Sequence, residues 1–112
     1  MAGITTHVLD AAYGRPAAGV PVRLERVHGS GAVDVLGEGR TDGDGRLRGL
    51  GPDVLAEGAY RLVFDTGAWF AAADRTTFYP EVVVTFAVTD PAAHHHVPLL
   101  LSPFAYSTYR GS

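Results

Sequence analysis

Apolar and polar residues alternate along most of this chain, which is the pattern of β-strands that bury one face. Between residues 20 and 27, apolar residues at 20, 22 and 24 alternate with Pro21, Arg23 and Glu25. Such a strand packs one side on a core and exposes the other to solvent. The sequence predicts eight strands, at residues 4–9, 20–27, 33–41, 46–48, 60–64, 82–88, 97–101 and 106–110.

Glycine and proline interrupt these strands, since the chain holds 14 Gly and 7 Pro. The groups at residues 14–16, 29–31 and 42–45 are typical of turns. Only residues 66–73 favour a helix, with Trp69, Phe70 and three alanines, and with Asp65 or Thr66 as the cap. We therefore expect an all-β fold, a two-sheet antiparallel β-sandwich of about eight strands with one short helix. The length of 112 residues predicts a single domain over residues 1–112.

Alternation also predicts which way two histidines point. In the first strand Ile4 and Val8 form the apolar side, so His7 lies on the opposite side. In the seventh strand the apolar positions are 97, 99 and 101, so His96 also points away from the core. The outward face carries His, Leu, Pro, Ser and Tyr where charged residues are usual. Such a half-apolar outer face predicts that another subunit covers it.

Composition removes several classes of function. The formal net charge is −3, so no basic surface is expected that would attract nucleic acid or an anionic membrane. All nine basic residues are Arg, and the chain has no Lys, Cys, Asn or Gln. A thiol nucleophile, a catalytic lysine, a disulfide and a phosphate-binding P-loop are therefore excluded. A catalytic site has to be built from His, Arg, Asp, Glu, Ser, Thr and Tyr.

The first residues show neither the charged region nor the apolar region of a secretory signal. No apolar run approaches the ~18 residues that a membrane-spanning helix needs. We therefore expect a cytoplasmic protein without a membrane partner.

Two groups of residues raise the possibility of a metal site. His94 and His96 have the spacing of metal ligands on one strand face, and His7 could supply a third ligand, as in a zinc hydrolase. The motif is short and no carboxylate follows it, so we expect no metal. The Asp42–Gly45 group contains two carboxylates, but it lacks the remaining ligands of a calcium loop, and a plain turn is expected. His28 is interpreted as a surface histidine.

Three strings in the sequence resemble the transthyretin-related family, and more narrowly its hydrolases. The strings are Thr-His-Val-Leu-Asp at 6–10, Thr-Asp-Gly-Asp-Gly-Arg at 41–46, and the segment from His96 to Ser112. The closing Tyr-Arg-Gly-Ser is the most specific mark, because it separates the hydrolases of this family from its hormone carriers. The resemblance covers essentially the whole chain. His95 stands where the family commonly has an aromatic residue, and Ala105 where it commonly has glycine.

The resemblance implies a reaction and an assembly. The reaction is the hydrolytic opening of the six-membered lactam ring of 5-hydroxyisourate to 2-oxo-4-hydroxy-4-carboxy-5-ureidoimidazoline, without metal or cofactor. The assembly is a homotetramer, a dimer of dimers whose active sites lie in a channel between the dimers. Matched position by position, the catalytic residues of the family fall on His7, Arg46, His96 and Ser112, and its substrate-binding residues on Tyr109, Arg110 and Gly111.

These residue types suit the hydrolysis of a cyclic amide. One histidine would activate water, and the second would orient water or protonate the leaving nitrogen. Arg46 would bind the anionic heterocycle or the developing oxyanion, and Ser112 would hold water or substrate. Two alternatives remain open at this point. One is a carrier of a small aromatic ligand that uses the same channel between subunits, and the other is a monomeric structural β-sandwich.

Overall fold

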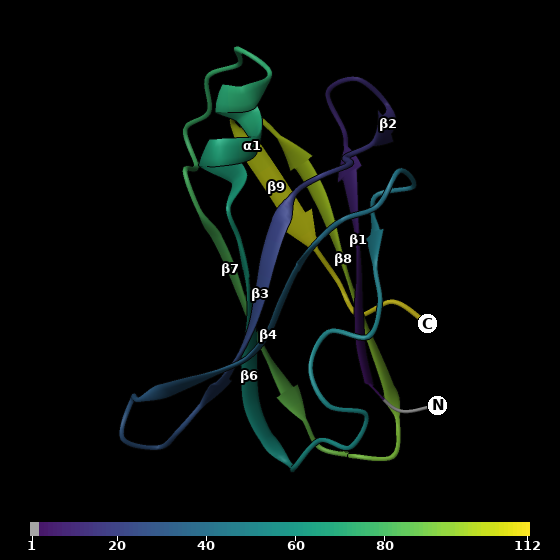
Figure 1. Ribbon diagram of the computed structural model, residues 1–112, viewed down its shortest axis with the longest axis vertical. Coiled ribbons are helices and arrows are strands. Elements are labelled where there is room, and N and C mark those ends of the chain that lie inside the picture. Colours follow the sequence, from purple (N-terminus) through teal and green to yellow (C-terminus); the bar gives the residue numbers. More distant parts are fainter. Residues whose placement is uncertain (1–2) are drawn as a thin grey trace.

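The computed structural model describes residues 3–112, and Met1 and Ala2 lie outside them. Two β-sheets face each other in this structure (Figure 1). The first sheet has the order β2 (Arg15–Pro16), β1 (Gly3–Asp10), β8 (His94–Ser102) and β9 (Ala105–Thr108), and β5 (Arg46–Leu47) also pairs with β1. The second sheet has the order β4 (Val33–Arg40), β3 (Pro21–Val27), β6 (Gly58–Phe64) and β7 (Val82–Val88). The expected two-sheet sandwich is confirmed.

The core lies between the sheets and is formed by alternate residues of the strands. Ile4 and Val8 of β1 and Leu99 of β8 are buried against Leu24 of β3 and Phe64 of β6. Burying a side chain of this size stabilises the fold by about 1.5–3 kcal/mol. The opposite face of β1 and β8 does not pack against the second sheet, and it carries polar side chains that include His7 and His96.

Antiparallel pairing dominates both sheets, but β1 pairs with β8 in parallel over the full length of β1, from Gly3 opposite His94 to Asp10 opposite Leu101. The alternation pattern carries no sign of this pairing. It places two segments about ninety positions apart in direct register, and β8 consequently begins at His94 rather than at residue 97.

The helix α1 (Thr66–Ala72) joins β6 to β7. The Asp65 side chain caps it by accepting a hydrogen bond from the Ala68 N–H at 3.2 Å. Phe70 is fully buried, and the Trp69 indole N–H donates to the Ala18 carbonyl at 2.7 Å. The helix therefore packs on the sandwich, as expected. Within residues 3–112 no helix has the length and apolar character needed to cross a membrane.

The segment around residue 15 differs from the sequence-based expectation of a turn at 14–16. The turn lies earlier, where the Gly14 N–H donates to the Asp10 carbonyl at 2.8 Å, and Arg15–Pro16 form the short strand β2 beside β1. Because β2 is at the edge of the sheet, the missing N–H of proline costs no ladder bond there.

Candidate active site

Arg46 is positioned by a tight turn. The Asp42 carboxylate accepts hydrogen bonds from the N–H groups of Asp44 at 2.9 Å and Arg46 at 3.0 Å. Gly45 has φ +77°, and a Cβ on it would collide with the Val8 carbonyl, so the turn requires glycine at this position. The group expected to form only a turn therefore fixes the start of β5, and the Asp42 carboxylate holds it.

His7 lies directly opposite Arg46 in the β1–β5 register. Its Nε2 is 2.9 Å from the Asp44 carbonyl, which can only accept a hydrogen bond. His7 therefore carries a proton on Nε2, and its side chain points to the outer face, as alternation predicted.

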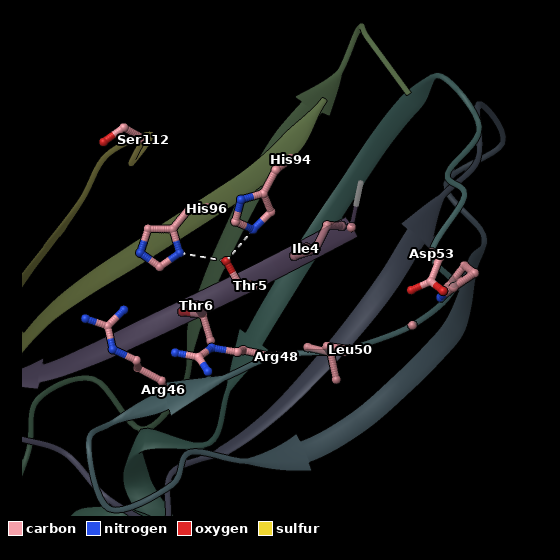
Figure 2. A pocket seen from close by; sticks show the side chains of 14 residues that line it. Ile4, Thr5, Thr6, Arg46, Arg48, Leu50, Asp53, His94, His96 and Ser112 are labelled. Carbon is pink, nitrogen blue, oxygen red and sulfur yellow. Dashed lines mark hydrogen bonds between the residues drawn. The ribbon is translucent and has the colours of Figure 1, made fainter. Parts of the chain in front are cut away.

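His96 also lies on the outer face, and its partner across the β1–β8 register is Thr5. The Thr5 hydroxyl lies 2.7 Å from Nδ1 of His96 and 2.8 Å from Nε2 of His94, so one oxygen joins two imidazoles (Figure 2). Thr5 was not among the predicted site residues, and His94 was considered only as a metal ligand. The available signal was spacing, because each stands two positions before a predicted histidine and shares its face.

The end of the chain folds back on His96. The Gly111 N–H donates to the His96 carbonyl at 2.8 Å, and a Cβ on Gly111 would overlap the His96 ring. The position therefore admits glycine and no larger residue without movement of the ring.

One hollow of about 720 Å³ collects several of these groups. Figure 2 shows Arg46, Arg48, His94 and His96 around it, and Ser112 also lines it. The structure thus brings together three predicted catalytic residues, Arg46, His96 and Ser112. Arg48, which was not among the predicted site residues, adds a second guanidinium.

Other predicted residues lie beside this hollow. His7 does not line it, although His7 is close enough to act electrostatically on His96. Tyr109 and Arg110 line a second hollow of about 310 Å³, which His96 also borders. His96 is therefore the residue that the two hollows share.

The surroundings of His96 favour its neutral form. Burial lowers its pKa below the ordinary value, and electrostatic repulsion of a positive His96 by His94, Arg46 and His7 lowers the pKa further. A neutral imidazole has a nitrogen that can accept a proton, so His96 is suited to act as a general base near neutral pH.

The histidine cluster does not take the form of a metal site. Among residues 3–112, no three His, Cys, Asp or Glu side chains lie in an arrangement that could hold a metal ion. The rings of His94 and His96 are both hydrogen-bonded to the Thr5 hydroxyl instead. Their neighbour His95 is buried on the core side, and His28 is exposed and paired with Asp34 at 2.7 Å.

Comparisons with known proteins agree with this geometry. A sequence profile described as the HIUase/Transthyretin family matches residues 4–111. A protein named 5-hydroxyisourate hydrolase from Caulobacter vibrioides is 50% identical over 116 residues, which cover 100% of both chains. The solved 5-hydroxyisourate hydrolase of Klebsiella pneumoniae is 38% identical with a TM-score of 0.87, and covers 100% of this chain and 94% of its own.

A solved transthyretin from Sparus aurata superposes with a TM-score of 0.91 at 29% identity, over 99% of this chain and 97% of its own. The backbone is therefore as similar to a transthyretin as to a hydrolase, and fold alone does not separate the two. The family match extends over nearly all of the described residues, and it confirms the resemblance expected from the strings near both ends. The chain belongs to the HIUase/Transthyretin family.

Proposed function

We propose that this chain is a hydrolase that opens the six-membered lactam ring of 5-hydroxyisourate. The observation that carries the proposal is the hollow in which Arg46 and Ser112 surround a histidine, His96, that is held neutral. The activity named for the relatives that match over the full length supports the same conclusion. Guanidinium and imidazole groups are suited to an anionic nitrogen heterocycle and to proton transfer.

In the proposed reaction His96 takes a proton from water, and the water oxygen forms a bond to the lactam carbonyl carbon. Arg46 stabilises the negative charge that develops on the carbonyl oxygen. The carbon–nitrogen bond then breaks, the nitrogen receives a proton, and the product is 2-oxo-4-hydroxy-4-carboxy-5-ureidoimidazoline. We assign the positioning of substrate and water to Ser112 and to the segment of Tyr109, Arg110 and Gly111.

We further propose that His7 acts in a site completed by a second protomer, in a homotetramer built as a dimer of dimers. His7 and His96 both lie on the outer face of the first sheet, where the hollow is open to solvent in one protomer. Half-buried Leu9 and Leu100 share that face, which suits contact with another subunit. The mass of the assembly in sedimentation tests this arrangement, and a monomer would contradict it. The cytoplasmic location stays a prediction of the sequence.

A small-ligand carrier is the second candidate, because the fold matches transthyretin and one such neighbour is described in complex with thyroxine. The two arginines and two histidines of the hollow make it a poor site for an apolar ligand.

The deciding experiment follows the ultraviolet absorbance of freshly generated 5-hydroxyisourate with and without the protein. A hydrolase at substoichiometric concentration accelerates the decay over many turnovers. Decay at the spontaneous rate would overturn the proposed function, and a stoichiometric change of absorbance without turnover would identify a carrier.

A further inference from the structure

The hydroxyl of Thr5 lies between two imidazole nitrogens and has a single proton to donate. It is 2.7 Å from Nδ1 of His96 and 2.8 Å from Nε2 of His94. A hydroxyl donates one hydrogen bond and accepts others, so at most one histidine receives the proton of Thr5 and the other donates its own. The protonation of His96 is therefore coupled to that of His94, although the two rings have centroids 6.2 Å apart.

Two arrangements satisfy this geometry when both rings are neutral and Thr5 donates to one of them. In the first, Nδ1–H of His96 donates to Thr5, Thr5 donates to Nε2 of His94, and Nε2 of His96 keeps a free lone pair. In the second, every donor is reversed, and Nε2 of His96 carries the proton. A histidine has different chemistry in the two cases, because only a nitrogen with a free lone pair accepts a proton.

The charges around the ring favour the first arrangement. Figure 2 shows the second nitrogen of His96 pointing away from Thr5, and the charge of Arg46 acts on this ring. A nearby guanidinium favours a lone pair over an N–H on the exposed nitrogen, for the same reason that it disfavours the charged ring. The other charged or titratable groups around His96 are His7, which acts on its charge, and the residues that line the same two hollows, which are Arg48, Asp53, His95, Tyr109 and Arg110.

We propose that Thr5 and His94 are positioning residues that hold His96 with its proton on Nδ1, so that Nε2 faces the substrate as the proton acceptor. This inference rests on the proposed hydrolase function. When Nε2 takes the proton of water, the hydrogen bonds from His96 to Thr5 and from Thr5 to His94 keep their directions. None of the three side chains, His96, Thr5 and His94, has to rotate. The Nε2–H of His96 then returns the proton to the leaving nitrogen.

The roles of the two positioning residues differ. Thr5 orients the ring directly, whereas His94 acts through Thr5 by receiving its proton. Without His94 the hydroxyl is free to turn and donate to Nδ1 of His96, which would move the histidine proton to Nε2. In catalytic triads, a wrong tautomer of the histidine costs about 10⁴-fold in kcat.

Long-range ¹H–¹⁵N spectra of the imidazoles test the arrangement without any substrate. In the unaltered protein we expect the shifts of a His96 protonated on Nδ1. Thr5→Ser should preserve them, while Thr5→Val and His94→Phe should move the population toward the Nε2–H form. His28→Phe is the matched control, because it removes an exposed histidine that belongs to the β3–β4 hairpin. A His96 that carries its proton on Nε2 in the unaltered protein would overturn the inference.

Activity supplies the second measurement. We expect Thr5→Val and His94→Phe to lower kcat/KM at least 10-fold, with Thr5→Ser and His28→Phe near the unaltered value. The same loss in Thr5→Ser as in Thr5→Val would contradict a role for the hydroxyl. If the unaltered protein does not accelerate ring opening while its spectra show the expected tautomer, the proposed function fails and the arrangement stands. If the protein is active but His96 has the opposite tautomer, the proposed function stands and the inference about Thr5 and His94 is wrong.

Discussion

The main chain of Gly111 is hydrogen-bonded to that of His96, and no side chain would fit between Gly111 and the histidine ring. This contact ties the last residues of the chain to the histidine assigned as the base. It gives a physical reason for glycine in the terminal Tyr-Arg-Gly-Ser segment, because the backbone approaches an imidazole too closely for a Cβ. Several expected effects of substitutions depend on this contact and on the groups around it.

Gly111→Ala should lower kcat/KM, because the new Cβ displaces the ring of His96. A misplacement of about 1 Å in an active site can cost about 10²-fold in rate. We expect a loss of at least 10-fold in the absorbance assay with an unchanged circular dichroism spectrum. Gly29→Ala is the matched control, since a Cβ at Gly29 meets nothing within 4 Å. Equal activity of both variants would show that the ring tolerates the intrusion.

Removal of residues 109–112 should abolish turnover while the fold persists. The deletion removes the Gly111 bond to His96 and the Ser112 wall of the hollow, but it leaves β9 and the core intact. We expect kcat/KM to fall at least about 10²-fold, the scale of lost positioning. Thermal unfolding checks that the truncated chain is folded, and a folded chain with full activity would exclude a role for the tail.

His7→Ala, Arg46→Ala and His96→Ala should each lower kcat/KM by at least about 10²-fold, since general acid–base catalysis supplies about 10²–10⁴-fold. The sedimentation mass should not change. His28→Ala is the control for loss of an exposed imidazole, and it should retain activity. Turnover of His96→Ala near the unaltered rate would remove His96 from the mechanism.

The pH dependence of kcat/KM should follow the titration of His96. Burial and the neighbouring positive charges lower the pKa of His96, so the neutral base is present at neutral pH. Activity should be constant around pH 7 and fall with acid as pH passes through this lowered pKa, below the ordinary histidine value of about 6.5. Arg46→Gln removes one of those charges, so the pKa of His96 should rise in an NMR titration.

The rise should be partial, because burial is the larger cause of the shift. Arg40→Gln, on the other sheet, serves as the control and should leave the titration unchanged. A His96 pKa that does not move in Arg46→Gln would show that the guanidinium does not act on the ring.

Arg75→Met should destabilise the fold through Asp10, whose buried carboxylate is paired with Arg75 at 2.8 Å. Removing one partner of a buried pair costs about 3–5 kcal/mol. Burial alone would raise the pKa of Asp10, but the hydrogen bonds from Arg75 and from the N–H groups of Tyr13 and Ala12 outweigh burial and lower it. This stabilisation is therefore present above the unfolded pKa of about 3.9 and is lost as pH falls through the lower folded value.

Urea unfolding at pH 7 and at pH 3 measures the effect. The difference between Arg75→Met and the unaltered protein should be large at pH 7 and smaller at pH 3. Arg75→Met with Asp10→Asn should regain part of the lost stability, because the unpaired buried charge is gone. A constant difference at both pH values would attribute the loss to packing of Arg75 on Tyr13 and Phe70 rather than to the ion pair.

The sequence by itself determined the faces of the strands and the chemistry available to the site. Alternation of apolar residues around His7 and His96 placed both imidazoles on the outer side, because successive side chains of a strand point to opposite faces. The glycine-rich turn before Arg46 and the helix near Phe70 were also predictable, since both follow from local backbone preferences. The three strings at 6–10, 41–46 and 96–112 indicated the family.

Only the tertiary structure decided which of these side chains meet. The parallel pairing of β1 with β8 sets Thr5 opposite His96 and beside His94, and nothing in either segment specifies that partner or register. The same holds for Gly111, whose contact with His96 requires the chain to leave β9 and return to β8. The physical reason is that alternation reports burial of one strand at a time, whereas a site is made by pairings between distant segments whose energies depend on the whole core.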